Sequence, residues 1–188
     1  MRIISGNYKG KKIQQPIDDK TRPLKDLTKE SIFNVINHSN KFNINLTKAF
    51  VLDLFSGVGS FGIECISRGA KKVTFIENYP KVLPILEKNL KNLKSINNYE
   101  IVNKDIYEDN FVNYFKNKFD IIFLDPPYKD KNLNHLFKKI FNLKILERNG
   151  VIILHRHKKE KEIFPPEFRI IEKRTYGISK IIFLSYLN

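Results

Sequence analysis

The sequence predicts an α/β fold in which a mostly parallel sheet is covered by helices on both faces. Short apolar runs that are typical of buried strands alternate with helical stretches from Ala49 onward, and a strand-turn-strand pattern follows them at the end of the chain. Alternating strands and helices favour a parallel sheet, because each crossover helix packs on a face of that sheet. A length of 188 residues suffices for one such domain and a small N-terminal extension.

The first residues predict a β-hairpin. Two strand-like pieces, 2–5 and 11–14, flank a turn that contains Gly6 and Gly10. Cations beside an aromatic ring suit RNA, because phosphates pair with lysine and exposed bases stack on rings. A solvated hairpin without a partner is the equally common alternative. The candidate RNA-binding residues of this hairpin are Arg2, Tyr8, Lys9, Lys11 and Lys12.

A helix is predicted from Leu24 to His38. The chain breaks before this helix at Thr21-Arg22-Pro23, and residues 39–47, which are rich in Asn and Lys, indicate a linker after it. We therefore expect two parts. Residues 1–45 form a hairpin-and-helix extension that contacts the substrate and covers the site, and residues 46–188 form the main domain with the cofactor site.

The main domain shows the alternation on which the fold class depends. Its predicted strands are Phe50–Phe55, Val73–Ile76, Tyr99–Val102, Phe119–Leu124 and Val151–Leu154. Its predicted helices span residues 60–68, 80–93, 107–117 and 130–144. The tail predicts a closing antiparallel hairpin, with strands at Phe168–Glu172 and Ile181–Tyr186.

The charge of the chain favours a polyanionic partner. A net charge of +14 and a pI near 9.7 attract nucleic acid through phosphate contacts and counterion release. A lysine-rich composition without any such partner is the alternative, since lysine far outnumbers arginine.

The sequence also limits where the protein is expected to be located and which metal sites it could form. No apolar run reaches membrane-spanning length and the first residues lack a signal-peptide core, so we expect a cytoplasmic protein with no membrane partner. The single cysteine, Cys65, excludes an internal disulfide and a cysteine-built zinc site. The four histidines show no ligand pattern, so we expect no metal, and we expect a monomer.

A glycine pattern follows the first predicted strand of the main domain. Gly57, Gly59 and Gly62 match G-x-G-x-x-G between a strand and a helix, which is the context that gives this pattern meaning. Glycines allow a sharp turn and the close approach of a ligand, and free N–H groups at the helix start attract an anion. The pattern predicts a nucleotide-like ligand.

Four acids end four successive predicted strands: Asp53, Glu77, Asp105 and Asp125. Glu77 follows a strand where an acid can accept the hydroxyls of a ribose, and Asp105 could accept from an adenine amino group. A single acid at a strand end is often only a helix cap. Four acids at one sheet edge form an acidic crevice, which would repel the pyrophosphate of NAD. Such a crevice favours S-adenosylmethionine, which carries an ammonium and a sulfonium.

The fourth predicted strand ends in Asp125-Pro126-Pro127-Tyr128. Because proline lacks the N–H that a ladder needs, a simple strand stop is one interpretation of this segment. The other interpretation is an active site. The acids and the glycine loop predicted at the same sheet edge favour the active site.

These motifs, in this order, resemble the class I methyltransferases that modify exocyclic amino groups. Further segments resemble the RsmD-type guanine-N2 methyltransferases of small-subunit (16S) ribosomal RNA. These segments are Met1–Gly6 with Gly10–Lys12, Arg22-Pro23 with Asp26, Glu30–Asn34, Ser67–Ala70, and Tyr176-Gly177 with Lys180. The resemblance implies a Rossmann-like fold, S-adenosylmethionine as cofactor, and 16S rRNA as partner, either free or within the small subunit or an assembly intermediate.

The resemblance also implies roles for individual residues. Asp125 and the Pro126 carbonyl would accept the N–H groups of the amine and aim its lone pair, while Pro127 stiffens the loop and Tyr128 stacks on the base. The cofactor would contact Asp53, Phe55, Ser56, Gly57, Gly59, Gly62, Glu77, Asn78, Asp105 and Ile106. The RNA would contact Arg2, Tyr8, Lys9, Lys11, Lys12, Arg22 and Lys25.

Two positions depart from the family pattern. The family usually has Arg-Pro-Thr-Thr/Ser-Asp, whereas this chain has Leu24 and Lys25 before Asp26. His155 stands where an acid is common, and no role is assigned to it.

Two rival functions use the same features. An adenine-N6 methyltransferase of DNA or RNA shares the Asp-Pro-Pro-Tyr chemistry, although this chain has no room for a large target-recognition domain. A non-catalytic RNA-binding factor could use the same fold. Protein glutamine methyltransferases are less similar, because they carry Asn where this chain has Asp125.

Overall fold

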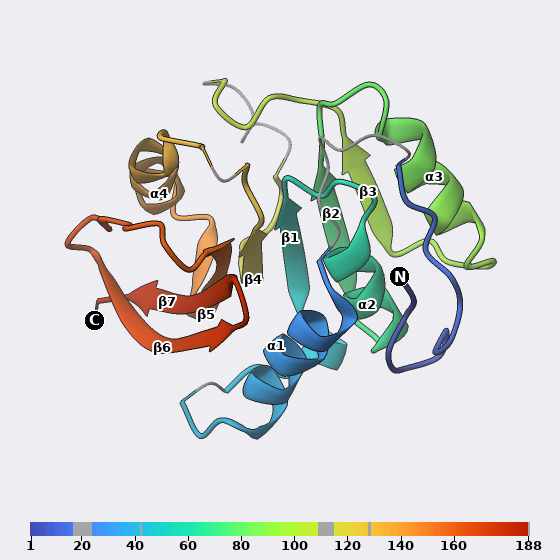
Figure 1. The fold of residues 1–188 in the computed structure, drawn as a ribbon, viewed down its shortest axis with the longest axis horizontal. Coiled ribbons are helices and arrows are strands. Elements are labelled where there is room, and N and C mark those ends of the chain that lie inside the picture. Colours follow the sequence, from blue (N-terminus) through green and yellow to red (C-terminus); the bar gives the residue numbers. More distant parts are fainter. Residues whose placement is uncertain (17–23, 42, 109–114, 128, 188) are drawn as a thin grey trace.

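The computed structural model describes residues 1–16, 24–41, 43–108, 115–127 and 129–187, and Figure 1 shows their arrangement. The helices are α1 (Asp26–His38), the short 3-10 helix η1 (Leu46–Lys48), α2 (Ser60–Ser67), α3 (Leu83–Lys91) and α4 (Leu133–Asn142). The strands are β1 (Phe50–Leu54), β2 (Lys72–Ile76), β3 (Tyr99–Val102), β4 (Phe119–Leu124), β5 (Leu146–His157), β6 (Phe168–Tyr176) and β7 (Ser179–Tyr186).

One seven-stranded sheet forms the centre of the molecule, in the order β3-β2-β1-β4-β5-β7-β6. The first five strands in this order are parallel to one another. The last two, β7 and β6, form an antiparallel hairpin that pairs with β5. The prediction of a mostly parallel sheet with a closing antiparallel hairpin is confirmed.

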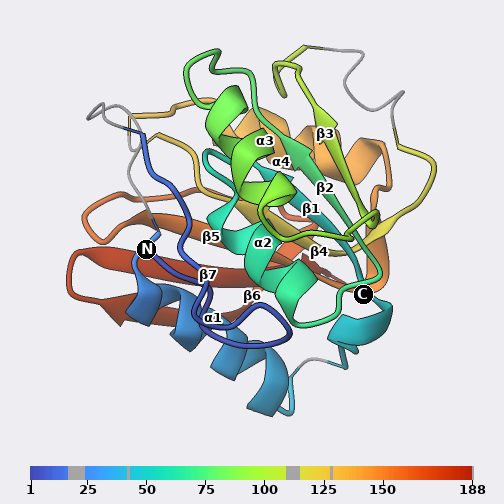
Figure 2. The same cartoon turned by 90° about the vertical axis from the view of Figure 1, so that its right-hand side faces the viewer.

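Helices cover both faces of the sheet, and alternate residues of each strand face opposite layers. Val51 of β1 belongs to the core shared with α1, α2 and α3, whereas Leu52 and Leu54 belong to the core shared with α4. Figure 2 shows α1, α2 and α3 in front of the sheet and α4 behind it. Because buried strands face apolar layers on both sides, they appear in the sequence as continuous apolar runs.

The element boundaries differ from the predicted ones at several places, including strand β6, which continues to Tyr176 instead of ending at Glu172. Strand β5 extends well beyond Val151–Leu154 in both directions, because its ends pair with β4 and β7. The N-terminal hairpin contains a single antiparallel bridge, between Arg2 and Lys12, rather than two strands. Of the helix predicted at 107–117, residues 109–114 lie outside the described residues, and the described ends form turns and bends.

The N-terminal segment runs along α2 from the first residue of the helix to its last residue, and then turns back along the helix. Met1 accepts a hydrogen bond through Sδ from the Ser60 hydroxyl, 2.7 Å away, at the start of α2. The turn then packs on the end of α2, where the Asn7 N–H donates to the Ser67 carbonyl at 2.7 Å. Because α2 runs from the carboxyl edge of the sheet to its amino edge, this turn lies at the amino edge.

A buried asparagine fixes the returning part of the segment. The Asn89 side chain accepts from the Gln14 N–H at 2.8 Å and donates to the Val58 carbonyl at 3.0 Å. It therefore links the N-terminal segment to the glycine-rich loop.

Candidate active site

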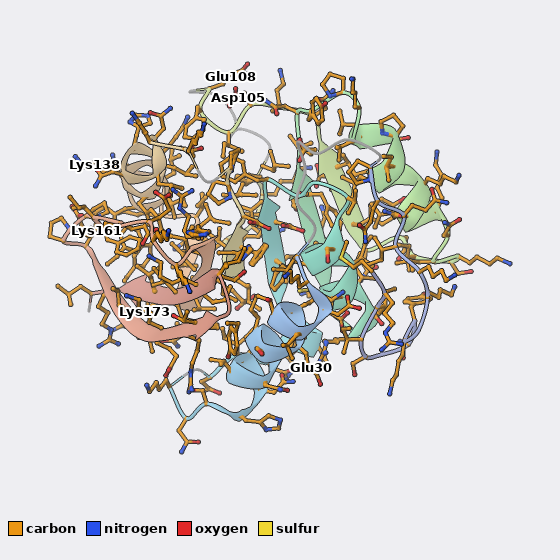
Figure 3. The ribbon with its side chains drawn as sticks, viewed as in Figure 1. Glu30, Asp105, Glu108, Lys138, Lys161 and Lys173 are labelled. Carbon is orange, nitrogen blue, oxygen red and sulfur yellow. The ribbon has the colours of Figure 1, made fainter. Side chains whose placement is uncertain are left out.

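A cavity of about 630 Å³ opens at the carboxyl edge of the parallel strands. This is the position where ligands bind in open α/β sheets. Figure 3 shows Asp105 and Glu108 at this edge, beyond the arrowheads of the strands, whereas Glu30 lies on α1 on the opposite side of the molecule. The predicted site residues that line the cavity are Asp53, Phe55, Ser56, Gly57, Glu77, Asn78, Asp105, Ile106, Asp125, Pro126 and Pro127.

Glu77 holds the glycine-rich loop against the end of β2. Its Oε2 accepts the Gly57 N–H at 2.7 Å, and its Oε1 accepts the N–H groups of Asn78 and Tyr79 at 3.0 and 2.8 Å. A carboxylate has about four acceptor positions, so three backbone donors leave about one for a ligand hydroxyl.

The three glycines of the loop serve different purposes. Gly57 has a φ of +54°, lines the cavity, and has no atom within 4 Å of the place a Cβ would occupy, so a ligand can approach its backbone. Gly59 and Gly62 do not line the cavity. At Gly59 a φ of +85° disfavours a side chain, and a Cβ would lie 2.5 Å from Leu86 Cδ1. At Gly62 a Cβ would lie 2.3 Å from Phe75 Cε1, so packing requires glycine there.

Asp53 is a buried acid in the floor of the cavity. Burial raises the pKa of Asp53 well above its ordinary value, and the charges of Asp125 and Glu77 raise it further. The Gly62 N–H, which donates to Asp53 Oδ2 at 2.9 Å, opposes this rise. A cation in the cavity would lower the repulsion among these carboxylates.

Asp125 lies one residue beyond the last paired position of β4. Its Oδ1 lies 2.8 Å from Nδ1 of His155, which occupies the adjacent place on β5. The loop that follows is also fixed: the Pro127 carbonyl accepts from Arg156 Nη1 at 2.7 Å and from the Asp130 N–H at 2.9 Å. No local pattern predicts the contacts of His155 and Arg156, since these residues lie about thirty positions further along the chain than their partners.

A tyrosine that the sequence analysis missed joins the two sides of the cavity. The Tyr107 N–H donates to Asp105 Oδ1 at 2.9 Å, and its hydroxyl donates to Asp130 Oδ2 at 2.6 Å. Burial and the Asp130 carboxylate raise the pKa of Tyr107, so it remains a neutral donor. Pro16 and Leu24, on either side of residues 17–23, also line the cavity.

The predicted RNA-binding residues that the structure describes lie in the N-terminal hairpin and directly before α1, outside the cavity lining. Tyr8 and Lys11 lie at the amino edge of the sheet, where the Tyr8 hydroxyl donates to the Lys94 carbonyl at 3.4 Å and Lys11 Nζ to the Asn92 carbonyl at 3.2 Å. The predicted residues that do not line the cavity are Arg2, Tyr8, Lys9, Lys11, Lys12 and Lys25, although Lys25 adjoins Leu24. Arg22 and Tyr128 lie outside the described residues.

Across the described ranges, no group of three or more His, Cys, Asp and Glu side chains is placed to hold a metal ion. In the same part of the chain, no helix has both the length and the apolar character to cross a membrane.

The strand order and the cavity define the fold of class I methyltransferases. Ribosomal protein L11 methylase from Lactobacillus delbrueckii shares this fold with a TM-score of 0.67 and 17% identity, over 94% of this chain and 92% of that chain. A solved structure from Haemophilus influenzae is more similar in sequence, with 30% identity and a TM-score of 0.76 over 100% of this chain and 98% of that one.

The family follows from the sequence comparisons. The family model described as "Conserved hypothetical protein 95" matches residues 1–185. Ribosomal RNA small subunit methyltransferase D of Haemophilus influenzae is 32% identical over 181 residues, which are 95% of this chain and 90% of that protein. The chain belongs to this family, and the predicted RsmD-type resemblance is confirmed.

Proposed function

We propose that the chain transfers a methyl group from S-adenosylmethionine to the exocyclic N2 amino group of a guanine in 16S ribosomal RNA, specifically guanine 966. The observation that carries this proposal is the position of Asp125 and Pro126 at the edge of a cavity lined by further acids. The names of the relatives support ribosomal RNA of the small subunit as the substrate class.

The cavity fits S-adenosylmethionine better than a dinucleotide. The carboxyl groups of Glu77, Asp105 and Asp125 line the cavity, so a ligand with positive groups would be stabilised here and a pyrophosphate would be repelled. Glu77 and Asp105 would hold the ribose and the adenine, and the open backbone of Gly57 would face the amino-acid part. When bound, S-adenosylmethionine would supply a methyl group on a positively charged sulfur.

The loop after β4 offers two acceptors to an amine. Asp125 Oδ1 lies against His155, which leaves Oδ2 for an N–H of the substrate. The Pro127 carbonyl is engaged by Arg156, so the Pro126 carbonyl is the second acceptor. Acceptors on both N–H groups favour a pyramidal nitrogen whose lone pair points toward the methyl donor, and catalysis then comes mostly from positioning.

The basic charge of the chain supports an RNA substrate. The chain as a whole carries a net charge of +14, whereas five of the six charged residues that line the cavity are acids, so the phosphates of an RNA would bind outside the cavity. Pro16 and Leu24 at the cavity support the proposal that the N-terminal extension covers the site.

Asp125→Ala tests the proposal. Methyl transfer to small-subunit particles from a strain without this activity should fall roughly 100-fold or more, while the Kd for S-adenosylmethionine stays within about threefold. Glu87→Ala, at an exposed position on α3, is the matched control and should leave both unchanged. Mass spectrometry of the methylated nucleotide separates guanine N2 from adenine N6. A fully active Asp125→Ala variant, or a methyl group on adenine, would contradict the assignment.

A further inference from the structure

His155 is a buried histidine that contacts the reacting loop without lining the cavity. Its side chain is 2% exposed, and its Nδ1 lies 2.8 Å from Asp125 Oδ1. Its Nε2 is buried and has no hydrogen-bond partner among the residues that the structure describes. Among the described residues, the imidazole therefore has one hydrogen-bond partner, the Asp125 carboxyl group.

The geometry fixes which ring nitrogen carries a proton. An ionised carboxylate only accepts hydrogen bonds, so Nδ1 of His155 must be the donor to Asp125. A proton on Nε2 would be a buried donor without an acceptor, which is unfavourable. The neutral tautomer with hydrogen on Nδ1 meets both conditions.

We propose that His155 is a positioning residue for methyl transfer, which holds Oδ1 of Asp125 so that Oδ2 faces the amine. This inference rests on the proposed function of Asp125. The neighbouring residue on β5, Arg156, holds the backbone of the same loop through the Pro127 carbonyl. Consecutive residues of one strand thus fix the carboxylate and the loop that carries it, and a small displacement of such a group lowers a rate strongly.

Amide substitutions separate this role from simple packing. The side-chain nitrogen of Asn is the same number of bonds from Cβ as Nδ1 of histidine, whereas that of Gln corresponds to Nε2. His155→Asn should therefore keep a donor to Asp125 and His155→Gln should lose it. His155→Leu removes the donor while it keeps most of the apolar volume, and His135→Leu, at an exposed position on α4, is the control.

We expect kcat to fall roughly 10- to 100-fold in His155→Leu and His155→Gln, and less than about fivefold in His155→Asn. The Kd for S-adenosylmethionine and the KM for small-subunit particles should stay within about twofold, which also shows that each variant is folded. Equal losses in the Asn and Gln variants, or an unchanged kcat in His155→Leu, would overturn the proposal.

A measurement on the unmodified protein keeps the proposal testable if every variant unfolds. In ¹⁵N-histidine NMR of the full chain with S-adenosylmethionine, the His155 signals should show hydrogen on Nδ1 and a bare Nε2. The opposite tautomer would refute the hydrogen bond to Asp125. Absence of methyl transfer by the wild-type protein would refute the proposed function instead, and the tautomer would still report on the contact.

Discussion

Glu64→Gln is expected to lower the free energy of unfolding by about 3–5 kcal/mol. The Glu64 carboxylate is fully buried in α2 and lies between the N-terminal segment and α1. Its Oε2 accepts the Ile4 N–H at 2.8 Å and lies 3.4 Å from Lys29 Nζ, while its Oε1 accepts the Ser5 N–H at 2.9 Å and Arg68 Nε at 2.8 Å.

The magnitude follows from what glutamine cannot do at this position. Gln keeps one oxygen and replaces the other by an NH₂ group, so two of the four donors around Glu64 face another donor. Lys29, whose side chain is fully buried, also loses the nearer of its two countercharges, because Glu64 Oε2 lies 3.4 Å and Asp26 Oδ1 lies 3.9 Å from its Nζ. Burial already lowers the pKa of Lys29, and the Glu64 charge opposes that shift, so the remaining cation becomes still less favourable. Breaking a buried pair from one side typically costs 3–5 kcal/mol.

Urea unfolding followed by circular dichroism measures the effect. Glu87→Gln is the matched control, because Glu87 pairs with Lys91 at 3.6 Å on the exposed surface of α3, and it should change stability by less than about 0.5 kcal/mol. The double variant Lys29→Met with Glu64→Gln should recover part of the loss, since the unpaired buried charge is gone. A Glu64→Gln protein within about 1 kcal/mol of wild type would refute the reasoning.

Two further predictions concern Asp53 and the glycine-rich loop. Because burial raises the pKa of Asp53 above its ordinary 3.8, the folded chain keeps a proton that the unfolded chain has released between these two pKa values. Stability should therefore fall as pH rises through this window, by up to about 1.4 kcal/mol per pH unit, and urea titrations of Asp53→Asn should lack this component. Gly62→Ala should lose about 1–3 kcal/mol of stability, measured by urea unfolding, because its Cβ would lie 2.3 Å from Phe75. Gly57→Ala should instead weaken S-adenosylmethionine binding, measured by calorimetry, with a smaller loss of stability; the reverse ranking of the two glycines would contradict their assigned roles.

The parts of the fold that sequence predicted are those with a local signal. Alternating strands and helices, the glycine loop and the acids at strand ends are each visible within a few residues, and parallel connectivity brings the strand ends to one edge. The different roles of the individual glycines could not be predicted from such a local signal. Gly59 and Gly62 match the pattern as well as Gly57, but their partners, Leu86 and Phe75, are distant in sequence.

The contacts of His155 with Asp125 and of Arg156 with the following loop depend on the register between β4 and β5. A shift of one residue would turn the His155 side chain to the other face of the sheet and away from Asp125. The register is visible only in the folded sheet, where Leu124 is paired with Leu154. The sequence pattern therefore predicts the loop at Asp125–Pro127 as a candidate site, whereas the residues that hold this loop are identified only by the register.

The composition of α2 agrees with its burial, but it does not indicate which segment covers the helix. Every residue from Ser60 to Ser67 is buried, and the helix is small or apolar on almost all sides, as a helix covered all round should be. The cover is the N-terminal segment, whose Ile3 and Ile13 join the core formed by the main domain and α1. An acid in such a helix requires buried donors, and Glu64 finds two of them in the backbone of this segment.

This shared core bears on how RNA contact by the extension has to be tested. Deleting the first twenty residues would remove Ile3 and Ile13 from the core and leave Glu64 without two backbone donors. A weaker RNA affinity in such a variant would then reflect damage to α2 and to the glycine loop that precedes it. Lys9 and Lys12 are exposed, and charge-removing substitutions there leave the buried contacts in place. Because each lost phosphate contact lowers the salt dependence of binding, the slope of affinity against salt distinguishes RNA contact from loss of structure.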